Sequence, residues 1–204
     1  ISLGLVGSEM CIRDSIGSCN NHQATNLAPF SSLFHLGSNP PLLGMISRPD
    51  LVERHTLANI LAVGAWTINH LHTEMLAAAH QCSARYPSEV SEFAATGLTP
   101  HWIDSHLAPF VAESHFRIGM TLESTLDIAA NGTTLIIGRV ACVQMQEQAF
   151  AADGSIDLSA MDVLASTALD TYFQLKPLAR YAYAKPDRAP RQLDATTPSL
   201  PTQP

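Results

Sequence analysis

Residues 116–145 read FRIGMTLESTLDIAANGTTLIIGRVACVQM, and this stretch decides the class of fold. Two long runs compatible with β-strands, 116–130 and 133–145, flank the pair Asn131-Gly132. That pair is typical of the two-residue type I′ turn that joins antiparallel strands. The sequence therefore predicts a long antiparallel β-hairpin.

Short strands precede this hairpin. IGSCN (16–20), NHQAT (21–25) and NLAPFSSLF (26–34) read as the start of a β-meander, with Asn and His at the turn. LLGMIS (42–47) follows two prolines and has the length and content of a buried strand, and AWTINHLH (65–72) reads as another. Strands in this number and of this length favour a closed or sandwich β architecture.

Only a few helices are expected. Thr56 suits the N-cap of a helix over 57–63 that stops at Gly64, and Thr73 suits the N-cap of a second helix over 74–83. Further short helical segments are predicted over 90–100 and 161–173, before a last strand over 178–184. These helices are too few to alternate with strands in βαβ units, and the sequence carries neither a P-loop nor G-x-G-x-x-G.

Bulk properties narrow the function. A chain of 204 residues fits one domain, and a formal charge of −7 argues against a general nucleic-acid binder. No run of 18 apolar residues is present, so we expect a soluble protein. The four cysteines, at 11, 19, 82 and 142, are scattered without C-x-x-C spacing, which favours a reducing cytoplasm over an oxidising compartment.

The two ends of the chain differ from the middle. Residues 1–15, ISLGLVGSEMCIRDS, lack the basic start of a signal peptide and are similar to a translated adapter remnant found at the ends of sequences assembled from short reads. We expect 1–15 to be non-native, 16–187 to form the domain, and the Pro-rich polar residues 188–204 to be a disordered tail.

Four segments in order carry a resemblance to a known family: NLAPFSSLFHLGSNPPLLGMISRP (26–49), ERHTLANI (53–60), SEFAATGLTP (91–100) and LIIGRV (135–140). Together they resemble flavin reductase-like proteins. The resemblance implies a mainly β fold, an antiparallel Greek-key split β-barrel with a few flanking helices. It also implies a homodimer that holds one FMN, or sometimes FAD, at each subunit interface, reduced by NADH or NADPH.

The resemblance also implies site residues. Between positions 14 and 84 the only Lys or Arg residues are Arg48 and Arg54, which bracket the loop leading into the helix at Thr56. Guanidinium groups and a helix N-terminus suit a phosphate. We expect Arg48, Arg54, His55 and Thr56 to hold the flavin phosphate, and the turn formed by Asn26, Ala28, Pro29, Phe30, Ser31 and Ser32 to line the isoalloxazine ring. The alternatives are solvated loop arginines and a core turn around a buried Phe30.

The expected function is an NAD(P)H-linked, flavin-dependent oxidoreductase, and the alternative is a non-catalytic FMN carrier or sensor. The flavin carries the redox chemistry, so no catalytic acid or base is named. His80, Arg85 and Tyr86 lie where they could cover a nicotinamide, although packing or surface roles are favoured. The electron acceptor stays open, a monooxygenase partner being one possibility. A metal site at His70-x-His72 and His80-x-Cys82 is disfavoured, so we predict no metal.

Overall fold

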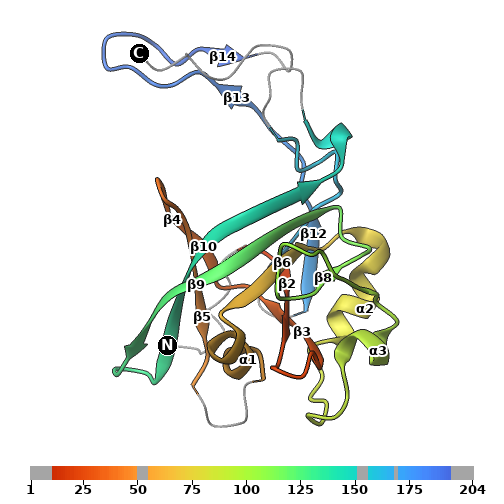
Figure 1. Cartoon of the computed structure of the whole chain (residues 1–204). Helices are drawn as coiled ribbons and strands as arrows, with labels where there is room; N and C mark the ends of the chain where they lie inside the picture. Colours follow the sequence, from red (N-terminus) through yellow and green to blue (C-terminus); the bar gives the residue numbers. More distant parts are fainter. Residues whose placement is uncertain (1–10, 50–54, 151–155, 168–169, 194–204) are drawn as a thin grey trace, which may run out of the picture.

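The computed structural model describes residues 11–49, 55–150, 156–167 and 170–193 (Figure 1). Its body is an antiparallel sheet of seven described strands. In lateral order these are β3 (Thr25–Phe30), β2 (Asp14–Cys19), β6 (Ala65–His70), β9 (Phe116–Ile128), β10 (Thr133–Met145), β5 (Pro41–Ser47) and β4 (Leu33–Ser38). The predicted class, mainly β with a few flanking helices, is confirmed.

The order of the strands closes the sheet. β3 and β4 form its two outer edges, yet only Ser31 and Ser32 separate them in the chain. Three peptide steps span at most about 11 Å, so the sheet has to curl until its edges meet at this link. The Ser32 Oγ donates a 2.9 Å hydrogen bond to the carbonyl of Ile46 on β5 and holds the link in place. We call this junction of β3 and β4 the seam.

The curled sheet encloses an apolar core. Its largest fully buried side chains come from five strands: Ile16, Met45, Trp66, Ile68, Met120 and Ile136. The helix α1 (His55–Val63) adds the buried Ile60 to this cluster and so covers one end of the barrel. It ends at Gly64, whose φ of 73° is left-handed, as the sequence predicts.

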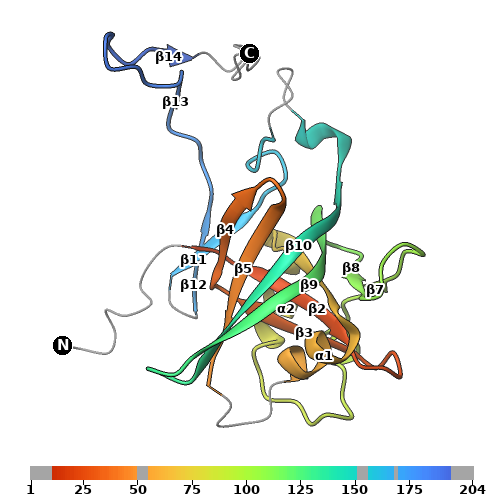
Figure 2. The same cartoon turned by 60° about the vertical axis from the view of Figure 1, so that its left-hand side comes forward.

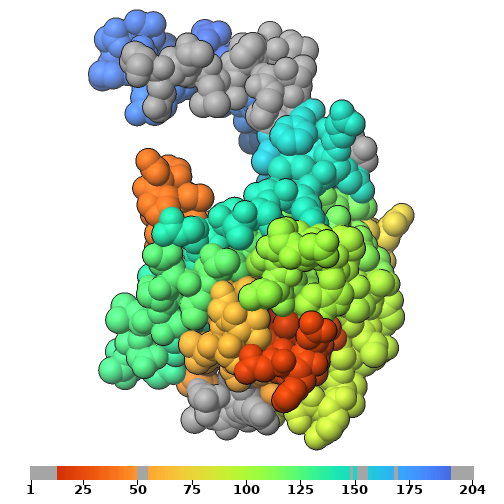
Figure 3. All heavy atoms as spheres, viewed as in Figure 1, coloured from red at the N-terminus to blue at the C-terminus, as the bar shows by residue number. Residues whose placement is uncertain are grey.

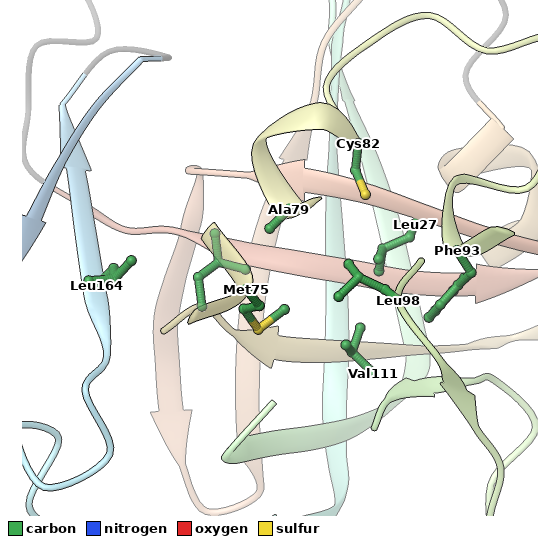
Figure 4. Close-up of a cluster of buried hydrophobic side chains, with 9 residues drawn as sticks. Leu27, Met75, Ala79, Cys82, Phe93, Leu98, Val111 and Leu164 are labelled. Carbon is green, nitrogen blue, oxygen red and sulfur yellow. The ribbon is translucent and has the colours of Figure 1, made fainter. Parts of the chain in front are cut away.

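A second layer packs outside β3. It contains the 3₁₀ turn η1 (Thr73–Met75), the helices α2 (Leu76–Gln81) and α3 (Glu92–Thr96), and the short strands β7 (Pro100–His101) and β8 (Phe110–Val111). Figure 4 shows Leu27 of β3 among the side chains of this layer, with Cys82 and Phe93 at either end of the segment between α2 and α3. No helix in the described ranges combines the length and the apolar content needed to cross a bilayer.

The ends of the chain form smaller sheets. β1 (Cys11–Ile12) pairs with β11 (Leu164–Thr167), which pairs with β12 (Thr171–Gln174). β13 (Arg180–Tyr181) and β14 (Gln192–Leu193) form a hairpin that stands away from the barrel in both ribbon views (Figures 1 and 2). Residues 11–15 and 192–193 thus take part in strands, while the non-native origin of 1–15 and the disordered tail over 188–204 stay predictions.

The long hairpin is confirmed, but its predicted turn type is wrong. Thr133 pairs with Ile128, so four residues connect β9 to β10, and of these Gly132 is left-handed at φ 71° while Asn131 is not. Asn131 instead accepts a hydrogen bond from the Thr133 backbone N–H through its side-chain Oδ1, at 3.1 Å. This side-chain hydrogen bond holds the turn without the left-handed φ that a type I′ turn needs at both central residues.

Three local predictions about helices are wrong. The segment 161–173 forms β11 and β12, because Leu164 and Ala165 are buried by strand pairing rather than along a helix face. Thr56 lies inside the first turn of α1, which begins at His55. Thr73 is also inside its helix, with His72 at the cap position.

Replacing Gly138 should destabilise the barrel. A Cβ built at this position overlaps the indole ring of Trp66, which is fully buried, so Gly138→Ala forces the core to move. Overpacking of this kind costs about 1–3 kcal/mol. Urea unfolding should show the loss, whereas the control Gly37→Ala, which meets nothing closer than 3.9 Å, should unfold like the parent. Equal stabilities of the two variants would contradict this description of the core.

Two buried histidines predict a loss of stability in mild acid. His106 bonds to the carbonyl of Trp66 at 3.0 Å and His72 to that of Glu113 at 2.9 Å, and burial lowers the pKa of both imidazoles. The unfolded chain therefore takes up protons at higher pH than the folded chain, so stability is complete above about pH 6.5 and falls as pH drops below it. The difference between the melting temperatures at about pH 7.5 and about pH 5.5 should be smaller for His106→Gln than for the parent, because this variant keeps a donor for the Trp66 carbonyl but cannot take up the proton. An equal difference in parent and variant would argue against this role.

Candidate functional site

A pocket of about 600 Å³ lies at the seam, between the barrel and its outer layer. Four parts of the described chain line it: Arg13 before β2, β3 with the following turn, the end of β5 with the start of α1, and the segment from the end of α2 to the start of α3. We call residues 83–88 of that last segment the rim loop. The lining residues are Arg13, Asn26, Ala28, Pro29, Phe30, Ser31, Ser32, Ile46, Ser47, Arg48, His55, Thr56, Leu57, Cys82, Ser83, Ala84, Arg85, Tyr86, Pro87, Ser88 and Glu92.

The structure brings the predicted site residues together. Arg54 lies outside the described residues. The other nine all line this pocket: Asn26, Ala28, Pro29, Phe30, Ser31, Ser32, Arg48, His55 and Thr56. The volume falls within the roughly 300–1,000 Å³ usual for sites of small molecules and cofactors. Contact of these residues with a flavin stays a prediction.

Asn26 organises one wall of the pocket. Its Nδ2 donates to Ser18 Oγ on β2, at 3.2 Å, and to Thr56 Oγ1 on α1, at 3.0 Å. Both of its amide hydrogens are therefore in use, and all three side chains are buried. Because Thr56 Oγ1 accepts this bond, its own hydroxyl hydrogen is left to point at a ligand. Asn26 thus positions the start of α1 against β3.

The outer edge of β3 is open to the pocket. On this edge the Leu27 N–H donates to the buried Glu92 carboxylate at 2.9 Å. N–H groups alternate between the two edges of a strand, so those of Ala28 and Phe30 face β2. Pro29 has no N–H and tolerates the edge position. The strand thus offers a ligand no backbone N–H from Ala28, Pro29 or Phe30, and the chain then turns at Ser31 and Ser32 into β4.

The pocket wall is cationic although the chain is acidic. Among the described residues, Arg13, Arg48 and Arg85 line it against one carboxylate, Glu92, which already accepts the Leu27 N–H. Within the described ranges, no hydrogen bond or ion pair holds the side chain of Arg48 or Arg85. The pocket therefore suits an anionic ligand.

Arg13 belongs to a group of side chains that sequence reasoning missed. It is buried, and its guanidinium lies 5.5 Å from the centre of the Tyr172 ring. Burial raises the pKa of Tyr172, so the phenol is neutral, and it meets His80 Nδ1 at 2.8 Å. No local pattern could have found this group, because its members lie up to about 160 positions apart in the chain.

The residues of the metal site that the sequence disfavours have other partners. His70 Nδ1 contacts the Asp14 carboxylate, and His72 stacks on His115 with ring centres 4.0 Å apart. Burial raises the pKa of Cys82 to about 11, so its thiol is protonated near neutral pH. In the part of the chain that the structure describes, no three His, Cys, Asp or Glu side chains are placed to hold a metal ion together.

A smaller recess of about 140 Å³ adjoins the pocket. It shares Asn26, His55, Ser88 and Glu92 with the main pocket and continues to Asn20 and Asn59. In the space-filling view the yellow-green loop region beside it lies at the lower surface, near the red turn between β2 and β3 (Figure 3). The recess therefore extends the lined space from the pocket towards the β2–β3 turn and α1.

Removing the Asn26 amide should loosen the pocket. In Asn26→Ala the buried Thr56 hydroxyl loses its donor and Ser18 keeps only the bond from Asn59, at 3.2 Å. A buried polar group left without a partner costs about 1–3 kcal/mol. Urea titration should therefore show a clear loss of stability, and the control Asn59→Ala, whose bond is partly exposed, should lose less. If Asn59→Ala is the less stable variant, Asn26 does not hold this wall.

Comparison with known proteins gives a family match and structural neighbours. The model of the flavin reductase like domain matches residues 15–159. An uncharacterised protein of Bacillus subtilis is 28% identical over 135 residues, which cover 64% of this chain and 66% of that protein, so the match spans just under two thirds of the relative.

Among solved structures, a Shewanella frigidimarina protein with a split barrel domain, provisionally described as a flavin reductase, superposes with a TM-score of 0.84. It is 42% identical, with 89% of this chain and 91% of that chain covered. Component B of nitrilotriacetate monooxygenase from Bacillus cereus gives 0.79 at 22% identity, covering 86% and 90% of the two chains. An FMN-binding protein from Thermus thermophilus gives 0.71 at 17%, covering 85% and 91%. The last two show the fold alone, and the split barrel predicted from the sequence is confirmed.

Proposed function

Because the chain belongs to the flavin reductase-like domain family, we propose that it is a flavin-dependent oxidoreductase that binds FMN in the seam pocket and takes hydride from NADH or NADPH. One observation carries the proposal. The turn Asn26–Ser32 and the phosphate-binding candidates Arg48, His55 and Thr56 come from separate parts of the chain, yet line a single pocket.

The phosphate end of the site lies where β5 and α1 meet. α1 has nine residues, and the N–H groups of its first turn lack partners within the helix. They favour an anion, as do the Arg48 guanidinium, which has no partner among the described residues, and the hydroxyl hydrogen that Thr56 retains. These groups suit the phosphate of FMN, and Arg54, although outside the described residues, is proposed to join them.

The ring end lies along the open edge of β3. Phe30 and Pro29 offer apolar contact, and Ser31 and Ser32, which also line the pocket, are proposed to offer polar groups to the edge of the ring. A bound flavin supplies the redox chemistry, accepting a hydride and thus two electrons from a dihydronicotinamide, which becomes a nicotinamide cation. The protein orients the ring and limits access of water, and we assign no side chain as acid or base.

The assembly is part of the proposal. We propose a homodimer, supported by the family and by apolar side chains that the hairpin β13–β14 and the segment before it leave exposed, including Leu178 at 99% and Tyr183 at 85%. The fold shared with a monooxygenase component supports a monooxygenase partner as one outlet for electrons. The free thiols Cys19, Cys82 and Cys142 suit the cytoplasm, where we place the protein.

The visible spectrum of the purified protein, with and without added FMN, tests the binding half of the proposal. We expect a bound flavin that denaturation releases as FMN. Mixing with NADH or NADPH and excess free flavin tests the catalytic half, and rapid nucleotide oxidation is expected. Flavin binding without oxidation would support a carrier or sensor instead, and a protein that binds no flavin would overturn the proposal.

Arg48→Gln should weaken flavin binding. Loss of a charge-assisted hydrogen bond to a phosphate corresponds to about a tenfold or greater rise in the FMN dissociation constant. Riboflavin, which lacks the phosphate, should bind parent and variant alike. Arg188→Gln removes an exposed arginine outside the pocket and serves as the control. If riboflavin and FMN lose affinity equally, Arg48 does not hold the phosphate.

A further inference from the structure

The rim loop is fixed at both ends. On one side Cys82 is buried, and its thiol donates to the carbonyl of Ala78 at 3.4 Å. On the other side Ser91 Oγ lies 2.7 Å from Thr25 Oγ1, and Glu92 accepts the Leu27 N–H at 2.9 Å. Both contacts reach β3. The loop is therefore held against the open edge of the strand that forms the ring end of the pocket.

Arg85 is the charged group that this loop presents. Its side chain is exposed, lines the pocket and, within the described residues, forms no ion pair or hydrogen bond. The neighbouring Tyr86 is held by Gln81, whose Nε2 donates to the phenol oxygen at 3.1 Å. A guanidinium beside a fixed neighbour at a pocket mouth offers a preformed fork of donors for a phosphate.

The two serine hydroxyls of the loop have acceptors within the protein. Ser83 Oγ donates to the carbonyl of His80 at 2.6 Å, and Ser88 Oγ donates to the Glu89 carboxylate at 3.1 Å. Among the residues that the structure describes, Arg85 of the rim loop and Arg48, which follows β5, are thus two pocket-lining cations without an ion pair. Two separate cations suit two separate anions. The adjoining recess, which Ser88 also lines, leaves further room beside the loop, between the β2–β3 turn and α1.

We infer that Arg85 binds a phosphate group of the dinucleotide that delivers hydride. This inference rests on the proposed function, in which Arg48 holds the phosphate of FMN. Both NADH and NADPH carry a pyrophosphate, and NADPH carries a 2′-phosphate in addition. Arg85 therefore acts in substrate binding and specificity and takes no part in hydride transfer itself.

Kinetics with three hydride donors test the inference. Arg85→Gln should raise KM for the dinucleotide about tenfold and change kcat less than about twofold. A rise in KM for NADPH alone assigns Arg85 to the 2′-phosphate, and an equal rise in KM for NADH and NADPH assigns it to the pyrophosphate. N-benzyl-dihydronicotinamide carries no phosphate, so the variant should oxidise it like the parent. Arg85→Lys should recover part of the affinity because it keeps the charge.

The control is Arg139→Gln. Arg139 is also exposed, but it pairs with Glu123 at 2.9 Å on the β9–β10 hairpin and does not line the pocket. Its KM values should match those of the parent. Unchanged KM values for both dinucleotides in Arg85→Gln would overturn the inference, as would an equal loss with the phosphate-free donor.

Two binding measurements separate this inference from the proposed function. Dissociation constants of FMN and FAD should not change in Arg85→Gln. A loss confined to FAD would assign Arg85 to the flavin's own pyrophosphate and overturn the inference. If the parent binds FMN but oxidises none of the donors, the proposed activity fails, and a titration with NADP⁺ then decides the inference alone. Equal NADP⁺ affinity of parent and Arg85→Gln would overturn it.

Discussion

Closure of the barrel through two residues is the constraint on which the rest of the structure depends. β3 and β4 lie at opposite edges of the sheet order, and Ser31 and Ser32 force those edges together. Among the described strands β3 pairs with β2 alone, so its outer edge has no strand partner there. Open edges of sheets need partners. Here Glu92 takes the Leu27 N–H, Pro29 removes a donor, and the remaining length of the edge faces the pocket.

The closed barrel also determines where α1 can lie. Ile60 has to reach the apolar core inside the barrel, which brings the start of the helix to β2 and β3. The bonds from Asn26 to Ser18 and Thr56 then fix its first turn. A buried amide with both hydrogens used contributes more to a defined geometry than an exposed pair such as Arg188 with Asp187, which water screens. One side chain thus couples the fold to the orientation of the site.

Much of this arrangement could be predicted from the sequence where the signals are local. Gly64 ends α1, and the segments that flank Asn131 and Gly132 form the long hairpin. The contribution of Arg13 to the pocket and its contact with the Tyr172 ring could not be predicted, since they depend on contacts between distant parts of the chain. Within 161–173 the Ala and Leu content favours a helix locally, but residues 164–167 pair as a strand with β1 and β12.

The two walls of the pocket differ in how firmly they are built, and this difference bears on which ligand each can hold. The wall formed by β3 and α1 contains buried, hydrogen-bonded groups, Asn26 and Thr56, whose positions exist before a ligand arrives. Preorganised groups favour a ligand that stays bound, because little ordering entropy is lost on binding. The rim loop carries Arg85 in water, where pairing with a phosphate is weaker and more sensitive to salt. This asymmetry supports the proposal of a resident cofactor on the first wall and an exchanging substrate on the second.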